Sequence, residues 1–203
     1  MDSGGRALEI LLLSLALAAG PSTATEVLKA RDAEVRATVP AKGVELTPAT
    51  RQKLESILTR TVDLEGVARA SLGKNWDDAT PATRKKFLDA FKQRFRKATA
   101  DQFTDDYRGT EVKYLPELPA EEGGVKVPTE VVIKGEATHI DYVMRKEAGE
   151  WRIVDIVVDD VSTVENYRSS FGRIIKKEGM DGLINRLNKG TVKQAGKDTK
   201  PAN

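Results

Sequence analysis

Hydrophobic residues recur with two different periods along the chain. Over most of residues 25–107, and again over 162–189, they recur every three to four positions, which predicts helices. Between them come short runs rich in β-branched and aromatic residues, which predict strands at 110–115, 124–134, 137–146 and 150–158. Helices, then consecutive strands, then helices indicate an α+β fold. We expect a four-stranded antiparallel twisted sheet with helices packed on it, enclosing an apolar cavity.

The strand predicted at 150–158 is apolar at both its odd and its even positions. Trp151, Ile153 and Val157 alternate with Val154, Ile156 and Val158. A strand with one face in water should instead alternate apolar and polar residues. Both faces therefore need cover, which we expect from helices on one side and a second helical layer or the contents of a cavity on the other.

The last two strands are joined by a predicted hairpin. Ala148-Gly149 fits a two-residue turn, and pairing Glu147 with Glu150 fixes the register. The expected cross-strand pairs are then Met144 with Ile153, Tyr142 with Asp155, and Ile140 with Val157. The residues that share one sheet face in this register are Ile140, Tyr142, Met144, Ile153 and Val157.

Polar residues in the predicted sheet raise an enzymatic alternative, a small-molecule isomerase or dehydratase on a cone-shaped α+β roll. His139 and Asp141 offer a base and an acid beside the phenol of Tyr142. Alternation along the strand puts His139 and Asp141 on one face and Tyr142 on the other, so they do not converge. Asp155 would need hydrogen bonds if buried. We expect it to accept them from Tyr142 or from the backbone, and not to act in catalysis.

The long helix predicted from residue 80 has two contrasting faces. An apolar stripe recurs every four residues at Phe87, Phe91 and Phe95. The opposite face carries Lys85, Lys92 and Arg96. Aromatic rings buried beneath a helix cannot stack on bases, so this mixture does not indicate nucleic-acid binding. The three cations are candidates for docking to acidic partner or membrane surfaces.

Composition narrows the function further. The chain has 203 residues, 39% hydrophobic and 32% charged, which suits one soluble domain. It has no cysteine and one histidine, His139, so we expect neither a disulfide scaffold nor a metal site. The net charge of +2 lacks the strong basic excess that is typical of nucleic-acid-binding domains.

The amino terminus predicts a cleaved signal peptide at residues 1–24. Arg6 supplies a positive charge, Ile10–Ala19 is apolar but too short to span a bilayer, and Ser22–Ala24 offers small residues for cleavage. A buried amino-terminal helix is the alternative. We expect an exported protein in the periplasm, with a folded domain at 25–189 and a flexible basic tail at 190–203.

Three segments together resemble a known family. They are Leu72–Phe95, Ile140–Phe171 and Gly179–Leu187. Their order and spacing, over roughly residues 50–188, are similar to MlaC, also called the toluene-tolerance family, the periplasmic phospholipid-binding component of the Mla (maintenance of lipid asymmetry) system. Asp160 departs from the family, which usually has glycine there. A turn at that position favours a positive φ.

The resemblance implies a lipid carrier and not an enzyme, with phospholipid as its cargo. It also implies two partners, an inner-membrane ABC transporter carrying an MCE-domain ring and an outer-membrane lipoprotein complex; we expect the carrier to be a monomer. A related group linked to hopanoid export leaves a hopanoid-type lipid open as cargo, and an exported interaction module with a filled core remains an alternative. The candidate lipid-binding residues are Phe91, Phe95, Ile140, Tyr142, Met144, Trp151, Ile153, Val157, Val164, Tyr167 and Phe171.

Overall fold

The computed structural model describes residues 23–192, apart from residues 42, 101–109 and 134. The helices are α1 (Ala24–Thr38), α2 (Pro48–Thr61), α3 (Leu64–Leu72), α4 (Lys74–Asp78), α5 (Pro81–Ala100) and α7 (Thr163–Lys189), with a short 3-10 helix η1 (Glu121–Gly123). The strands are β1 (Val112–Tyr114), β2 (Leu118–Pro119), β3 (Val125–Ile133), β4 (Glu136–Glu147), β5 (Glu150–Val158) and β6 (Val161–Ser162). The fold is α+β, as predicted.

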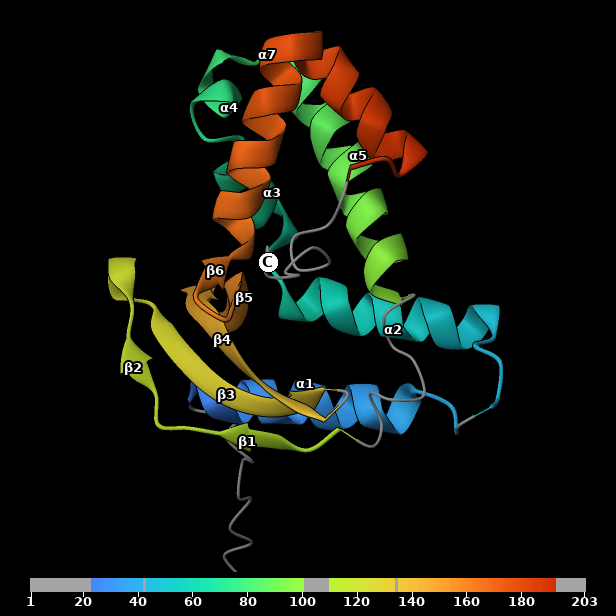
Figure 1. Ribbon diagram of the computed structural model, residues 1–203, viewed down its shortest axis with the longest axis vertical. Coiled ribbons are helices and arrows are strands. Elements are labelled where there is room, and N and C mark those ends of the chain that lie inside the picture. The colour runs from blue at the N-terminus through green and yellow to red at the C-terminus, as the bar shows by residue number, and fades with distance from the viewer. Residues whose placement is uncertain (1–22, 42, 101–109, 134, 193–203) are drawn as a thin grey trace, which may run out of the picture.

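A helix bundle and the sheet occupy opposite ends of the molecule (Figure 1). Helices α3, α5 and α7 form a bundle at one end, and α1 lies along the sheet at the other, with α2 between the two ends. The sheet is antiparallel in the order β1-β3-β4-β5-β6, and β2 also pairs with β3. The four predicted strands are present. Strands β2 and β6 were not predicted, because two residues are too short to show a period.

Helices begin at residues whose side chains cap the first turn. Thr47 accepts a hydrogen bond from a backbone N–H of the first turn of α2, and Ser162 does the same for α7. In α1, Thr23 and Glu26 form a reciprocal capping box, and Ala24 is fully buried. Most of the predicted signal peptide, residues 1–22, lies outside the described residues, as do residues 193–203 of the predicted tail.

The hairpin between β4 and β5 has the predicted turn. Ala148 and Gly149 both have positive φ, 51° and 86°, as a type I′ turn requires. The predicted pairs that the structure confirms are Glu147 with Glu150 and Met144 with Ile153.

A β-bulge overturns the predicted register beyond that point. Val154 is an extra residue in β5, because Ile153 pairs with Met144 while Asp155 pairs with Val143. The pairs that follow are Tyr142 with Ile156 and Ile140 with Val158. The prediction that Tyr142 faces Asp155 and Ile140 faces Val157 is wrong, because one extra residue moves every later side chain to the other face.

The bulge also explains why β5 is apolar at both odd and even positions. Before the bulge Ile153 points to the helices, and after it Ile156 does so, although the two residues are three positions apart. The other sheet face carries charged pairs across neighbouring strands, including Lys113 with Glu130 at 2.8 Å and Lys126 with Asp141 at 3.1 Å. One face of the sheet therefore meets water, and no second helical layer covers it among the described residues.

Asp155 holds the corner between β5 and α7. Its carboxylate accepts hydrogen bonds from the Ser162 hydroxyl at 2.5 Å, the Val164 backbone N–H at 3.0 Å and the Ile156 backbone N–H at 2.8 Å. The expectation of backbone partners is confirmed, and the bulge explains why Tyr142 is not one of them. At the same corner Asp160 has a φ of 64°, so the position does require the left-handed conformation.

Helix α7 changes direction at Gly179, where φ is 71° and ψ is 178°. The hydrophobic periodicity predicts helical structure over 162–189 and does not by itself mark this bend. Gly182 lies so close to the Glu178 side chain that a Cβ there would collide with it. The Arg186 guanidinium then ties the two halves together through both Glu178 carboxylate oxygens, at 2.8 and 2.6 Å. We call the part after the bend, residues 180–189, the C-terminal leg of α7.

Candidate functional site

The apolar stripe of α5 packs into an aromatic cluster with α7. Phe91 stands at its centre, with its ring centroid 5.9 Å from Phe87, 6.4 Å from Phe95, 5.9 Å from Tyr167 and 6.3 Å from Phe171. The contacts with Tyr167 and Phe171 are edge to face, an arrangement that adds about 0.5–1.5 kcal/mol per pair beyond the burial of surface. The four-residue spacing thus builds one continuous aromatic surface.

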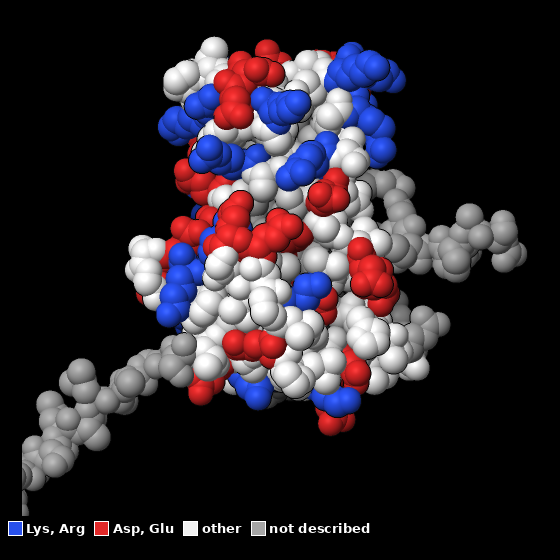
Figure 2. Space-filling model, turned by 90° about the vertical axis from the view of Figure 1, so that its left-hand side faces the viewer, with Lys and Arg blue, Asp and Glu red and all other residues white. Residues whose placement is uncertain are grey.

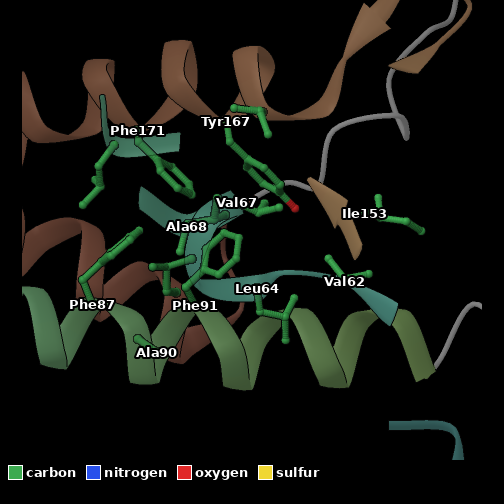
Figure 3. Packing of buried hydrophobic residues seen from close by; sticks show 14 of the residues in the cluster. Val62, Leu64, Val67, Ala68, Phe87, Ala90, Phe91, Ile153, Tyr167 and Phe171 are labelled. Atoms are coloured by element: carbon green, nitrogen blue, oxygen red, sulfur yellow. The ribbon is translucent and has the colours of Figure 1, made fainter. Parts of the chain in front are cut away.

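The aromatic cluster continues toward the sheet through α3 (Figure 3). In this view Val67 and Ala68 lie between the rings of α5 and α7, and Val62 lies beside Ile153. The backbone joins the two parts as well, because Asp63 donates its N–H to the carbonyl of Ile153 at 2.9 Å. The helices and the inner sheet face therefore share one hydrophobic core.

Most of the predicted lipid-binding residues meet in this core. The buried ones are Phe91, Met144, Ile153, Val164, Tyr167 and Phe171, and those packed against them are Phe95, Tyr142 and Trp151. Ile140 and Val157 are not part of the cluster. For Val157 the reason is the bulge, which places it on the solvent face of the sheet, and Ile156 contacts the core in its place.

A small pocket opens within the aromatic cluster, between α5 and the C-terminal leg of α7. Its volume is about 10 Å³, enough for about one water-sized group. The residues that line it are Phe91, Arg94, Phe95, Tyr167, Leu187 and Val192. A cavity large enough for acyl chains stays a prediction.

Two phenols lie on the inner face of the sheet, beneath α1. Burial raises the pKa of Tyr142 to about 12 and raises that of Tyr114 further, and the nearby Asp32 carboxylate of α1 acts in the same direction on both. Both phenols are neutral at physiological pH. They extend an apolar wall and do not provide a general base.

The other polar groups of β4 do not form a reactive site. His139 is exposed, and its backbone N–H donates to the Asp159 carboxylate at 3.1 Å. Asp141 pairs with Lys126 on the solvent face, away from Tyr142. In the part of the chain that the structure describes there is no group of three or more His, Cys, Asp or Glu residues able to hold a metal ion.

The comparisons with known proteins decide the family. A model of the MlaC protein family matches residues 31–189. This chain belongs to the MlaC family. A solved structure of a phospholipid-binding protein from Ralstonia solanacearum, in complex with a phospholipid, has the same fold, with a TM-score of 0.69 and 25% sequence identity. The match covers 83% of this chain and 97% of that one.

The predicted docking cations of this MlaC protein are partly neutralised. The Lys85 ammonium lies 2.8 Å from Asp89, and the Lys92 ammonium lies 3.2 Å from Glu65. Lys92 and Arg96 line a groove of about 590 Å³ between α2 and α5, and Lys85 does not. The other residues along the groove are Arg51, Glu55, Asp89, Gln93 and Lys97, so cations outnumber acids there.

Charge elsewhere on this MlaC protein is mixed. On the face turned to the viewer in Figure 2, Lys and Arg side chains are interspersed with Asp and Glu and do not form one continuous basic patch. Within the described residues, no helix is both long enough and apolar enough to cross a membrane.

Sequence reasoning missed several residues of the site. The bulge hid Ile156, and Leu187 of the C-terminal leg was not assigned to the cavity. Arg94 was also missed, although it had a signal. It lies seven residues after Phe87 and three after Phe91, a spacing that keeps it on the apolar side of α5.

Proposed function

We propose that this MlaC-family protein is a periplasmic carrier that binds a phospholipid by its acyl chains and shuttles it between membrane complexes. The observation that carries the proposal is the likeness, over 83% of this chain, to a protein solved with a phospholipid bound. The family match over residues 31–189 supports the same role.

The acyl chains would lie between α5, α7 and the inner face of the sheet. Phe91, Phe95, Tyr142 and Ile156 offer apolar surface from both sides of this space. Burying a methylene group is worth about 0.8 kcal/mol, so one acyl chain exposed to water costs on the order of 10 kcal/mol. Only a carrier with comparable apolar surface can take such a chain across an aqueous compartment.

Export completes the proposal. A signal within residues 1–24 would direct the chain to the periplasm and be removed there before Thr23, which caps α1, leaving a monomer that meets two partners. These partners would be an inner-membrane ABC transporter with an MCE-domain ring and an outer-membrane lipoprotein complex. The groove with Lys92 and Arg96, together with Lys85 on the same helix, would contact their acidic surfaces or the membrane.

Binding without catalysis is favoured by the placement of the polar groups. His139 and Asp141 are on the solvent face of the sheet, and the Asp155 carboxylate is engaged by hydrogen bonds that fix the start of α7. The apolar cluster presents no convergent acid and base to a bound molecule.

Solvent extraction tests the proposal directly. The protein is purified from the periplasm without detergent, extracted with chloroform and methanol, and the extract is analysed by mass spectrometry. We expect about one phospholipid for each protein molecule. A hopanoid-type lipid as the main species would change the cargo, and an extract without lipid, from protein that also fails to take up lipid from vesicles, would overturn the carrier role.

A further inference from the structure

Arg94 is a cation in apolar surroundings. It lines the small pocket of the aromatic cluster, and the other five lining residues are aromatic or aliphatic. Its Nε atom is shielded from solvent. Arg94 as a whole is half-buried, but this shielded Nε needs an acceptor, because an unsatisfied buried donor costs about 1–3 kcal/mol.

No described residue supplies that acceptor. The Nε atom donates no hydrogen bond, and no carboxylate of the described residues forms an ion pair with Arg94. The contrast with Arg186 of α7 is direct, because the latter binds both carboxylate oxygens of Glu178. The donors of Arg94 are therefore available to an anionic ligand.

The end of α7 offers a weaker explanation. Gly190 ends the helix in the left-handed conformation, and a Cβ at that position would lie 3.9 Å from the guanidinium carbon of Arg94. The helix dipole favours a cation there by only about 0.3–1 kcal/mol. The carbonyls of Arg186 and Leu187 already accept hydrogen bonds from Thr191 and Gly190. The dipole alone leaves the Nε donor of Arg94 unsatisfied.

We propose that Arg94 binds the phosphate of the phospholipid cargo while the acyl chains lie against Phe91, Phe95 and Tyr167. This inference rests on the proposed function and adds the residue that recognises the headgroup. A planar guanidinium can donate two parallel hydrogen bonds to phosphate oxygens, which gives both affinity and orientation.

The bend in α7 gives the headgroup a way in. The pocket has room for only about one water-sized group, so an occupant must displace Leu187 and Val192. Both residues follow the bend at Gly179, whereas Tyr167 and Phe171 precede it. Entry of the headgroup therefore requires the C-terminal leg to move against the Arg186–Glu178 pair, while the aromatic surface before the bend stays in place.

The test compares lipids with and without a phosphate. Delipidated full-length mature protein is titrated with phosphatidylglycerol and with a diacylglycerol of the same chains, using displacement of a fluorescent fatty acid. Wild-type protein should bind phosphatidylglycerol more tightly. Arg94→Gln should weaken phosphatidylglycerol binding by about tenfold, the loss expected for a charge-assisted hydrogen bond, and leave diacylglycerol unchanged. The affinity of Arg94→Lys for phosphatidylglycerol should lie between that of wild type and that of Arg94→Gln.

Arg173→Gln is the matched control, since it removes the same charge from an exposed position of α7 and should change the binding of neither lipid. Inorganic phosphate at millimolar concentration separates a lipid phosphate from a free anion, and we expect it not to displace phosphatidylglycerol. Equal binding of both lipids in wild type and Arg94→Gln would overturn the role of Arg94 while leaving the carrier in place. Displacement by inorganic phosphate would overturn the assignment to lipid, and wild-type protein that binds neither lipid would overturn the proposed function itself.

Discussion

Helix α5 has two faces with different chemistry, although they belong to the same twenty residues. The inner face carries Phe87 and Phe91, which are buried to 0% and 3% exposure among α3 and α7. The outer face carries Lys85 and Arg96, and its cations either pair with acids or line the groove beside α2. Under the proposed function, the inner face holds the cargo and the outer face meets a partner.

The contrast teaches that cargo binding and docking can be separated by mutation. Ridges of side chains four residues apart project to one side of a helix, so changes on the outer face do not reach the aromatic cluster. If this division is right, substitutions on the inner face should alter stability and lipid content. Those on the outer face should alter only the rate at which lipid is delivered.

The largest expected effect is on stability. Phe91→Ala should lower the free energy of unfolding by about 3–5 kcal/mol, because it leaves a cavity among four rings. Arg96→Ala should stay within about 0.5 kcal/mol of wild type. Urea unfolding of lipid-free protein, followed by circular dichroism, measures both. Similar losses for the two variants would contradict the division of α5.

The second prediction sharpens the same contrast on the sheet. Ile156→Asp should abolish lipid co-purification and destabilise the fold by about 2–4 kcal/mol, because it strands a carboxylate on the inner face. Val157→Asp should keep the lipid, because its side chain lies on the solvent face after the bulge. Lipid content per folded protein, checked by circular dichroism, distinguishes them. Loss of lipid from Val157→Asp but not from Ile156→Asp would support the register without a bulge.

The third prediction concerns delivery from the outer face. Changing Lys85, Lys92 and Arg96 to Glu should slow lipid transfer to acceptor membranes bearing the transporter, by on the order of tenfold at low ionic strength and less as salt is added. Lipid content should not change. The matched control reverses Arg173, Lys176 and Lys177, which are exposed cations of α7. Transfer rates that equal wild type across the salt series would leave these cations without a docking role.

The smallest effect is expected where α1 meets α2, far from both faces. The Arg60 guanidinium, whose Nη2 lies 2.7 Å from Glu34, holds the pKa of that carboxyl below its ordinary value of 4.5, and Arg31 adds to the effect. A lowered pKa in the folded state stabilises the protein above the unfolded-state pKa, and this contribution is lost as the pH falls through the folded-state pKa. The melting temperature of wild type should therefore drop slightly more between pH 6 and 3 than that of Glu34→Gln. If the melting temperatures of the two proteins fall in parallel with pH, the Glu34–Arg60 pair contributes nothing to stability.

The sequence predicts the periodic parts of this fold well. The long helix from residue 80, its aromatic stripe and the Ala148-Gly149 turn all depend on local chemistry that a single sequence displays. The bulge at Val154 does not, because β5 is apolar on both faces and either register buries valine or isoleucine. Arg94 was missed for a related reason: its position follows from helical spacing, but the C-terminal leg that closes the pocket around it comes from a distant segment.

The most direct test of the central claim is to locate the acyl chains. Mature protein is loaded with a phospholipid that carries a diazirine near the end of one chain, irradiated, digested, and sequenced by tandem mass spectrometry. The inner face should be labelled, at Phe91 or Phe95 of α5 and at Tyr167 or Phe171 of α7, with Lys92 and Arg96 free of label. Labelling confined to the outer groove or to the solvent face of the sheet at Val157 would show that the aromatic cluster is an ordinary core and that lipid binds elsewhere.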